Sequence, residues 1–217
     1  AHKSYDDCYR QHYGDVYPFQ DGIYDALRYL KQLGIRIGVV TNRSREFFGH
    51  EVALIDAGRW LELFDVTLCG DEARRHKPAP DSLHEATAAL GERPGSEVWY
   101  VGDTVSDMVT AGAAGVTSVF YNGGLWGEDW FEQTFATAHR SPRRPDLIVD
   151  DFDGLLDAVT LSLAKNDAPT ARKAQHQRPP RSILQRRHQP VLFGCGAHDG
   201  LRPPRELRRQ RIRRLHQ

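Results

Sequence analysis

The sequence is poor in cysteine and has no long apolar run. Its three cysteines, Cys8, Cys69 and Cys195, lie far apart and form no Cys-x-x-Cys pair, so neither a disulfide framework nor a zinc ribbon is indicated. No apolar stretch approaches the length that crosses a bilayer, and residues 1–5 lack the apolar segment of a signal peptide. We therefore expect a cytoplasmic protein that does not bind membranes.

Acidic and basic residues are equal in number over the whole chain, but they are distributed unequally between its two parts. Residues 1–165 contain 16 Lys and Arg against 26 Asp and Glu, and residues 166–217 contain 13 against 3. The second segment has repeated proline and few apolar residues outside Val191, Leu192 and Phe193, a composition typical of disorder. We expect residues 166–217 to be a largely disordered basic tail. No folded nucleic-acid-binding module accompanies it, so nucleic acid is not the expected partner.

Apolar periodicity predicts alternating helices and strands from residue 21 to residue 165, which we interpret as one domain. Repeated alternation implies an α/β fold, a Rossmann-like parallel sheet with helices on both faces. Residues 1–20 do not join this pattern, and their tyrosines recur with a helical spacing of four. Trp126 to Phe131 is read as an aromatic loop. The expected helices are 21–33, 44–57, 81–91, 106–114 and 155–164, and the expected strands are 35–40, 64–69, 97–101, 116–121 and 147–149.

Two carboxylates, Asp103 and Asp107, follow the expected strand 97–101. The first would stand at the carboxyl end of a parallel strand, where open α/β sheets bind ligands, and the second on the opening turn of the next helix. Such a pair suits a hard cation such as Mg²⁺. The alternative is purely structural, because Gly-Asp favours a turn and an acidic residue favours a helix N-terminus.

Two further polar positions follow neighbouring expected strands. Thr41 and Asn42 come directly after strand 35–40, and Lys77 lies in the loop before helix 81–91. A hydroxyl, an amide and a lysine at one sheet edge could hold phosphoryl oxygens beside a carboxylate-bound magnesium ion. Taken singly, Thr41 could instead cap the next helix, and Lys77 could be a solvated loop cation.

These motifs, in this order, resemble the haloacid dehalogenase (HAD) superfamily, and within it the phosphoglycolate phosphatase-like branch. The similar segments are Val39–Asn42, Lys77–Asp81 and Gly102–Asp107. By this resemblance, Thr41 and Asn42 would bind the phosphoryl group, Lys77 would neutralise its charge and orient the nucleophile, and Asp103 would ligate Mg²⁺. Asp107 would support the metal, directly or through another ligand, and Thr41, Lys77 and Asp107 form the catalytic set.

The resemblance departs from the family at its first motif. Such phosphatases attack with an aspartate of an Asp-x-Asp motif on an earlier strand, which a helical cap follows, and neither precedes Asp21. Residues 1–20 would then be the end of the cap. On this interpretation the sequence is an inactive fragment without its nucleophile, and its sheet has a gap at the centre.

Asp151 and Asp153 imitate the missing motif within Asp150 to Leu155. A permuted enzyme could use Asp151 as nucleophile and Asp153 as general acid and base. The favoured interpretation is an edge strand followed by the final helix, because aspartates suit the turn and the helix start.

The sequence thus predicts a magnesium-dependent phosphomonoester hydrolase core that acts on a small phosphorylated metabolite. Phosphoglycolate is the leading substrate by resemblance, and sugar phosphates, nucleotides and pyrophosphate stay open. The alternative is a non-catalytic module that binds phosphate and metal while its basic tail recruits a partner. A receiver-type signalling domain fits less well, because its motifs would be ordered differently. The oligomeric state is left open.

Overall fold

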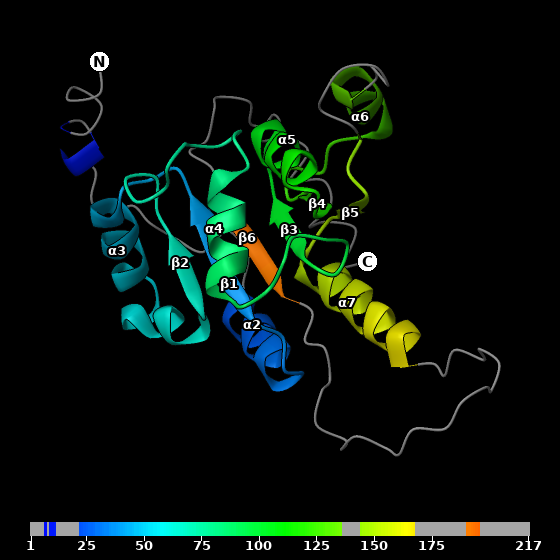
Figure 1. Cartoon of the computed structure of the whole chain (residues 1–217), viewed down its shortest axis with the longest axis horizontal. Coiled ribbons are helices and arrows are strands. Elements are labelled where there is room, and N and C mark those ends of the chain that lie inside the picture. Colours follow the sequence, from blue (N-terminus) through cyan, green and yellow to red (C-terminus); the bar gives the residue numbers. More distant parts are fainter. Residues whose placement is uncertain (1–6, 8, 12–21, 136–143, 168–189, 196–217) are drawn as a thin grey trace, which may run out of the picture.

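A computed structural model describes residues 7, 9–11, 22–135, 144–167 and 190–195 of the chain. In these residues six strands form one parallel sheet in the order β2-β1-β6-β3-β4-β5, drawn in Figure 1. The predicted α/β class is therefore confirmed. The strands are β1 (Ile37–Thr41), β2 (Val66–Leu68), β3 (Trp99–Gly102), β4 (Thr117–Tyr121), β5 (Leu147–Val149) and β6 (Val191–Cys195).

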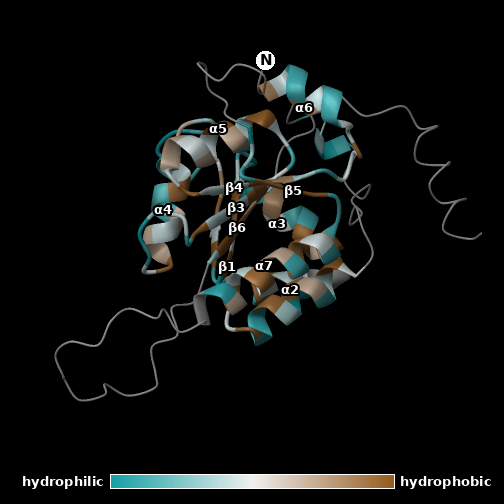
Figure 2. Cartoon of the chain, turned by 90° about the vertical axis from the view of Figure 1, so that its right-hand side faces the viewer, coloured by the Kyte–Doolittle hydropathy of each residue, from teal (hydrophilic) through white to brown (hydrophobic). Residues whose placement is uncertain are grey.

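Helices cover both faces of this sheet, as the view of Figure 2 shows. Helices α4 and α5 pack together against one face, and α2 and α7 pack together against the other. The helices are α2 (Ile23–Gln32), α3 (Arg45–Leu54), α4 (Asp81–Ala89), α5 (Val105–Ala114), α6 (Glu128–Phe135) and α7 (Phe152–Asp167), with a 3-10 helix, η1 (Asp56–Leu63).

The strands supply apolar side chains alternately to these two layers, because successive residues of a strand point to opposite faces. In β6, Val191 belongs to the core under α2 and α7, whereas Leu192 belongs to the core under α4 and α5, and both are fully buried. The inner face of α2 is formed by Ile23, Leu27 and Leu30, which are buried. A sheet buried on both faces explains why its strands read as continuous apolar runs.

Strand β6 corrects two expectations. It lies within the segment predicted as a disordered tail, yet it is paired with β1 on one side and β3 on the other. Residues 168–189 and 196–217 lie outside the described residues. The disorder prediction is wrong for Val191–Cys195, and the sheet has no central gap. The prediction followed the basic, proline-rich composition of the residues around the short apolar run Val191–Phe193. In the structure, pairing on both sides satisfies the backbone of this run and buries the side chains of Val191 and Leu192.

Elsewhere the predicted elements differ from the structure mainly at their ends. The expected loop Trp126–Phe131 is wrong in its second half, because Glu128–Phe135 forms helix α6, whose Phe131 and Phe135 pack on Phe120 of β4. The 3-10 helix η1 was not predicted. The interpretation of residues 1–20 as the end of a cap lies mostly outside the described residues, of which 7 and 9–11 are helical. No described helix is both long and apolar enough to cross a membrane.

Candidate functional site

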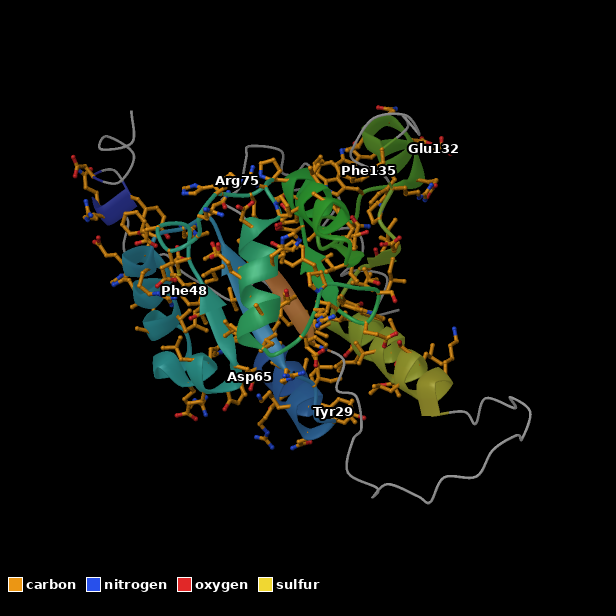
Figure 3. All side chains as sticks on the ribbon, viewed as in Figure 1. Tyr29, Phe48, Asp65, Arg75, Glu132 and Phe135 are labelled. Carbon is orange, nitrogen blue, oxygen red and sulfur yellow. The ribbon has the colours of Figure 1, made fainter. Side chains whose placement is uncertain are left out.

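The predicted site residues gather where the strands end. Thr41 is the last residue of β1, Asp103 follows β3, and Lys77 comes from the loop between β2 and α4. In Figure 3 the neighbouring Arg75 marks this end of the molecule, and Asp65 and Tyr29 mark the opposite end. The carboxyl ends of parallel strands form the usual ligand-binding edge of an open α/β sheet.

Lys77 is buried and makes three hydrogen bonds through its ammonium group. Its side chain is 3 % exposed. Nζ donates to Asp107 Oδ1 at 2.8 Å, to Tyr100 Oη at 3.1 Å and to the Val40 carbonyl at 3.3 Å. Three acceptors match the three protons of a lysine ammonium. Lys77 is therefore not a solvated loop cation, because this network holds it inside the sheet edge. We call Lys77, Tyr100 and Asp107 the buried cluster.

Asp107 is completely buried, at the start of α5. Its Oδ1 accepts from Lys77 and from Tyr100 Oη at 2.8 Å, and its Oδ2 accepts from the backbone N–H and the hydroxyl of Thr104. The bond from the Thr104 N–H forms a capping box together with the Asp107 N–H, which donates to the Thr104 hydroxyl oxygen at 3.2 Å. Gly102 permits the close approach of Asp107, because a Cβ at Gly102 would lie 2.4 Å from Asp107 Cβ. Asp107 is thus both a helix-capping residue and the counter-ion of Lys77.

Asn42 holds the backbone of Lys77. Its side-chain nitrogen donates to the Lys77 carbonyl at 3.1 Å, and its side-chain oxygen accepts from the Lys77 N–H at 2.9 Å. This pair of bonds fixes the lysine loop to the end of β1. The sequence predicted Asn42 as a phosphate ligand, and its side chain is used in the structure to position Lys77. Binding of a phosphoryl oxygen by Asn42 stays a prediction.

Thr41 and Asp103 stand on either side of β6. Thr41 is buried, and its hydroxyl accepts a hydrogen bond from the Arg43 N–H at 3.1 Å. Asp103 is exposed, at the point where β3 gives way to α5. The structure therefore brings Thr41, Lys77 and Asp107 to one edge, with Asp103 at the same edge but open to solvent.

Two residues of the site were not predicted, Tyr100 and Gly194. Tyr100 is completely buried in β3 and joins Lys77 to Asp107 through its hydroxyl. A tyrosine inside a strand that is buried along its whole length is a signal that could have been used, since a buried hydroxyl requires a hydrogen-bond partner. Gly194 of β6 faces the same cluster, because a Cβ built on it would lie 2.6 Å from Asp107 Oδ1. Nothing in the local sequence places β6 beside β3.

An exposed ion pair closes the loop that carries Lys77. Arg75 Nη2 lies 2.7 Å from Asp81 Oδ2, and Arg75 Nε donates to Asp81 Oδ1 at 3.0 Å. The hydrogen bond from the Arg75 guanidinium holds the pKa of Asp81 below its usual range. This pair joins the loop to the first turn of α4. Arg75 is thus a surface cation two residues before the buried Lys77.

Asp151 lies at the edge of the sheet. Strand β5 is the outermost strand, separated from β6 by β4 and β3, which places it roughly 14 Å from β6 at the usual strand spacing. The Asp151 carboxylate accepts from the Gly154 N–H at 2.8 Å, at the start of α7. The edge strand and final helix predicted here are confirmed, and the capping bond gives Asp151 a structural role.

The residues at this edge fit a magnesium ion through Asp103. Asp107 already accepts four hydrogen bonds, the number that a carboxylate's lone pairs provide. Among the described residues, no group of three or more His, Cys, Asp and Glu could hold a metal. Mg²⁺ is commonly bound through one or two carboxylates together with substrate phosphate and water. An exposed Asp103 at the same sheet edge as the buried Lys77 ammonium fits that mode, with Asp107 orienting Lys77.

The doubly covered parallel sheet and the polar residues at its carboxyl edge define a Rossmann-like α/β protein with a candidate phosphate-binding site. Comparison with known proteins agrees. A family model described as haloacid dehalogenase-like hydrolase matches residues 2–121, more than half of the chain. The chain belongs to the haloacid dehalogenase-like hydrolase family.

Curated relatives in this family are phosphatases by name. The chain is 28 % identical over 159 residues to pyrophosphatase PpaX of Bacillus mycoides (strain KBAB4), covering 70 % of this chain and 67 % of that protein. It is 31 % identical over 142 residues to phosphoglycolate phosphatase of Salmonella choleraesuis (strain SC-B67), covering 65 % of this chain and 51 % of that protein. The chain thus spans between about half and two thirds of the length of these relatives.

A solved structure supports the fold. A HAD-superfamily hydrolase from Ehrlichia chaffeensis superposes with a TM-score of 0.50 at 22 % identity, covering 65 % of this chain and 57 % of that one. This similarity shows that the arrangement of the sheet and its helices is shared with that protein.

Proposed function

We propose that this chain carries the phosphoryl-binding and magnesium-binding part of a HAD-type phosphomonoester hydrolase that acts on a small phosphorylated metabolite. The observation that carries the proposal is the buried ammonium of Lys77 at the carboxyl edge of the sheet, 2.8 Å from Asp107. A cation held in place in a dry site stabilises charge on phosphoryl oxygens more strongly than a cation in water.

The surrounding residues would orient the phosphoryl group against this cation. The bond from Lys77 to the Val40 carbonyl is the longest of the three at 3.3 Å, so a phosphoryl oxygen would replace it at the least cost. The Thr41 hydroxyl ends the adjacent strand, and Asn42 keeps the lysine loop in register through its two bonds to the Lys77 backbone. Phosphoryl transfer depends mainly on such positioning and on charge neutralisation.

Magnesium would bind at Asp103 and share its coordination with the bound phosphate. When present, the ion would neutralise charge on the phosphoryl oxygens that Lys77 does not contact. The relatives named phosphoglycolate phosphatase and pyrophosphatase support phosphoglycolate and pyrophosphate as the first compounds to test.

The test is calorimetric titration of the full chain with orthophosphate, phosphoglycolate and pyrophosphate, with and without MgCl₂. We expect binding that magnesium strengthens and that Lys77→Met removes. Arg75→Met is the matched control, because it deletes a cation from the same loop at an exposed position. Asp103→Asn should reduce the magnesium dependence and keep a weaker phosphate affinity. Equal affinities for the Lys77 and Arg75 variants would contradict the proposal.

A further inference from the structure

A cavity of about 550 Å³ lies at the outer edge of the sheet, between α6, β5 and the start of α7. These three elements lie on the same side of the molecule in Figure 1. The volume falls within the roughly 300–1,000 Å³ that small-molecule sites occupy. Strand β4 separates β5 from β3, whose end carries the buried cluster, so the cavity is a second place on this sheet where a ligand could bind.

The cavity has an excess of negative charge. Three carboxylates line it, those of Glu128, Asp150 and Asp151, and none of the described residues that line it is Lys, Arg or His. Glu128 forms an exposed ion pair, 2.5 Å from Arg144 Nη2. Asp150 and Asp151 are exposed, and each accepts one side-chain hydrogen bond, through Oδ1. In the part of the chain that the structure describes, no residue donates to Oδ2 of either aspartate, so both carboxylates can accept from a ligand.

A buried amide fixes the polar wall of the cavity. Asn122 is 5 % exposed. Its Nδ2 donates to Asp150 Oδ1 at 2.9 Å and to the Trp126 carbonyl at 3.1 Å, and its Oδ1 accepts from the Trp126 N–H at 2.8 Å. One side chain thus holds a carboxylate and an indole on the same cavity. Groups that are fixed before binding lose less conformational entropy when a ligand arrives.

The rest of the lining is mainly aromatic and aliphatic. Trp126 stacks on Trp130 with 5.1 Å between ring centroids and 18° between planes, Phe131 is buried in α6, and β5 supplies Leu147 and Val149. An aromatic face attracts organic cations because its π-system is negative there. A guanidinium group combines both requirements, since it stacks on aromatic rings and presents a planar set of donors to carboxylates.

We propose that this cavity binds a small organic cation that carries a guanidinium group on an alkyl chain. The guanidinium would bind Asp150 and Asp151, and the alkyl chain would lie against Leu147 and Trp126. A metal ion fits less well, because no group of three or more His, Cys, Asp and Glu among the described residues could hold one. The volume suits a small molecule rather than a protein interface. The inference is independent of the proposed phosphate site, to which no residue of the cavity contributes.

The test is calorimetric titration of the full chain with N-acetyl-arginine amide and with N-acetyl-citrulline amide, which has nearly the same shape and no charge. We expect only the arginine compound to bind. Sodium chloride should weaken this binding, because the attraction of the exposed Asp150 and Asp151 is screened by salt.

A double variant tests the two aspartates directly. Asp150→Asn/Asp151→Asn removes both charges and keeps a side-chain oxygen to accept from Asn122 and from the Gly154 N–H. We expect its affinity for N-acetyl-arginine amide to fall about tenfold or more, since hydrogen bonds to charged groups are lost. Asp157→Asn is the matched control, because Asp157 is an exposed carboxylate of α7 that does not line the cavity, and its affinity should be unchanged.

The possible results are distinct. Absence of binding to the wild type would overturn the proposal, as would equal binding of the arginine and citrulline compounds or equal losses in the double variant and Asp157→Asn. Tighter binding of acetyl-Gly-Arg-Gly amide would overturn the small-molecule assignment in favour of a polypeptide. Circular dichroism checks folding. If the double variant does not fold, the wild-type comparison of the two compounds and its salt dependence still decide.

Discussion

Two strand ends carry the same residue type and use it in opposite ways. After β3, Asp107 is completely buried, is paired with Lys77 and accepts four hydrogen bonds. After β5, Asp151 is exposed and accepts one hydrogen bond from the N–H of Gly154. Both aspartates lie at the start of a helix, so their local sequences look alike.

The difference arises from position in the sheet. Strand β3 is interior, between β6 and β4, whereas β5 is at the edge. Only the interior strand end is enclosed by neighbouring strands and by the Lys77 loop, which supplies the lysine cation, while β3 itself supplies Tyr100. A carboxylate becomes a charged site residue where other elements converge on it, and it stays a helix cap where they do not.

The largest effect should come from removing the buried carboxylate. Asp107→Ala leaves the Lys77 ammonium buried without its counter-ion, and we expect the free energy of unfolding to fall by ~3–5 kcal/mol. Urea denaturation of the variant and the wild type measures this change. A loss no larger than that of Asp151→Ala would remove the distinction between the two strand ends.

Removal of one hydroxyl from the buried cluster should have an intermediate effect. Tyr100→Phe loses the bonds to Lys77 and Asp107, both charged, and should lower the free energy of unfolding by ~1.5–3 kcal/mol. Tyr29→Phe is the control, because Tyr29 is 42 % exposed on α2. Chemical denaturation should leave the Tyr29 variant close to the wild type, and equal losses for the two tyrosines would argue against a connected cluster.

The lysine loop should depend on Asn42. Asn42→Ala removes both side-chain bonds to the Lys77 backbone, and we expect a loss of ~1–2 kcal/mol in unfolding free energy. Because the lysine then loses its fixed position, the affinity for orthophosphate should fall as well, which calorimetry would show. Unchanged affinity with reduced stability would limit Asn42 to a structural role.

The smallest effect should come from the edge carboxylate. Asp151→Ala removes the capping bond to Gly154 and should cost ~1 kcal/mol, the usual value for a helix N-cap. Thermal or urea unfolding measures the loss, and orthophosphate binding should be unchanged. Weakened phosphate binding in this variant would instead indicate that Asp151 takes part in the phosphate site.

Much of the site could be predicted from the sequence because its parts follow strand ends. Thr41, Lys77, Asp103 and Asp107 each lie beside a recognisable apolar run or turn, and an α/β alternation brings those ends to one edge. The magnesium and phosphate roles of these residues stay predictions. Asn42 illustrates the limit, since an amide at a strand end is equally suited to a ligand and to the backbone of Lys77, and only the fold shows which one it contacts.

The sequence alone determined the family, the parallel α/β class and the identity of the cationic and acidic residues, because local periodicity and short-range motifs encode them. Tertiary structure alone decided that Val191–Cys195 lies in the middle of the sheet, that Tyr100 joins Lys77 to Asp107, and that Gly194 faces them. The physical reason is that strand pairing is non-local. A short apolar run far along the chain has no local signal for its partners, and its place is set by the unpaired backbone of β1 and β3 that it satisfies.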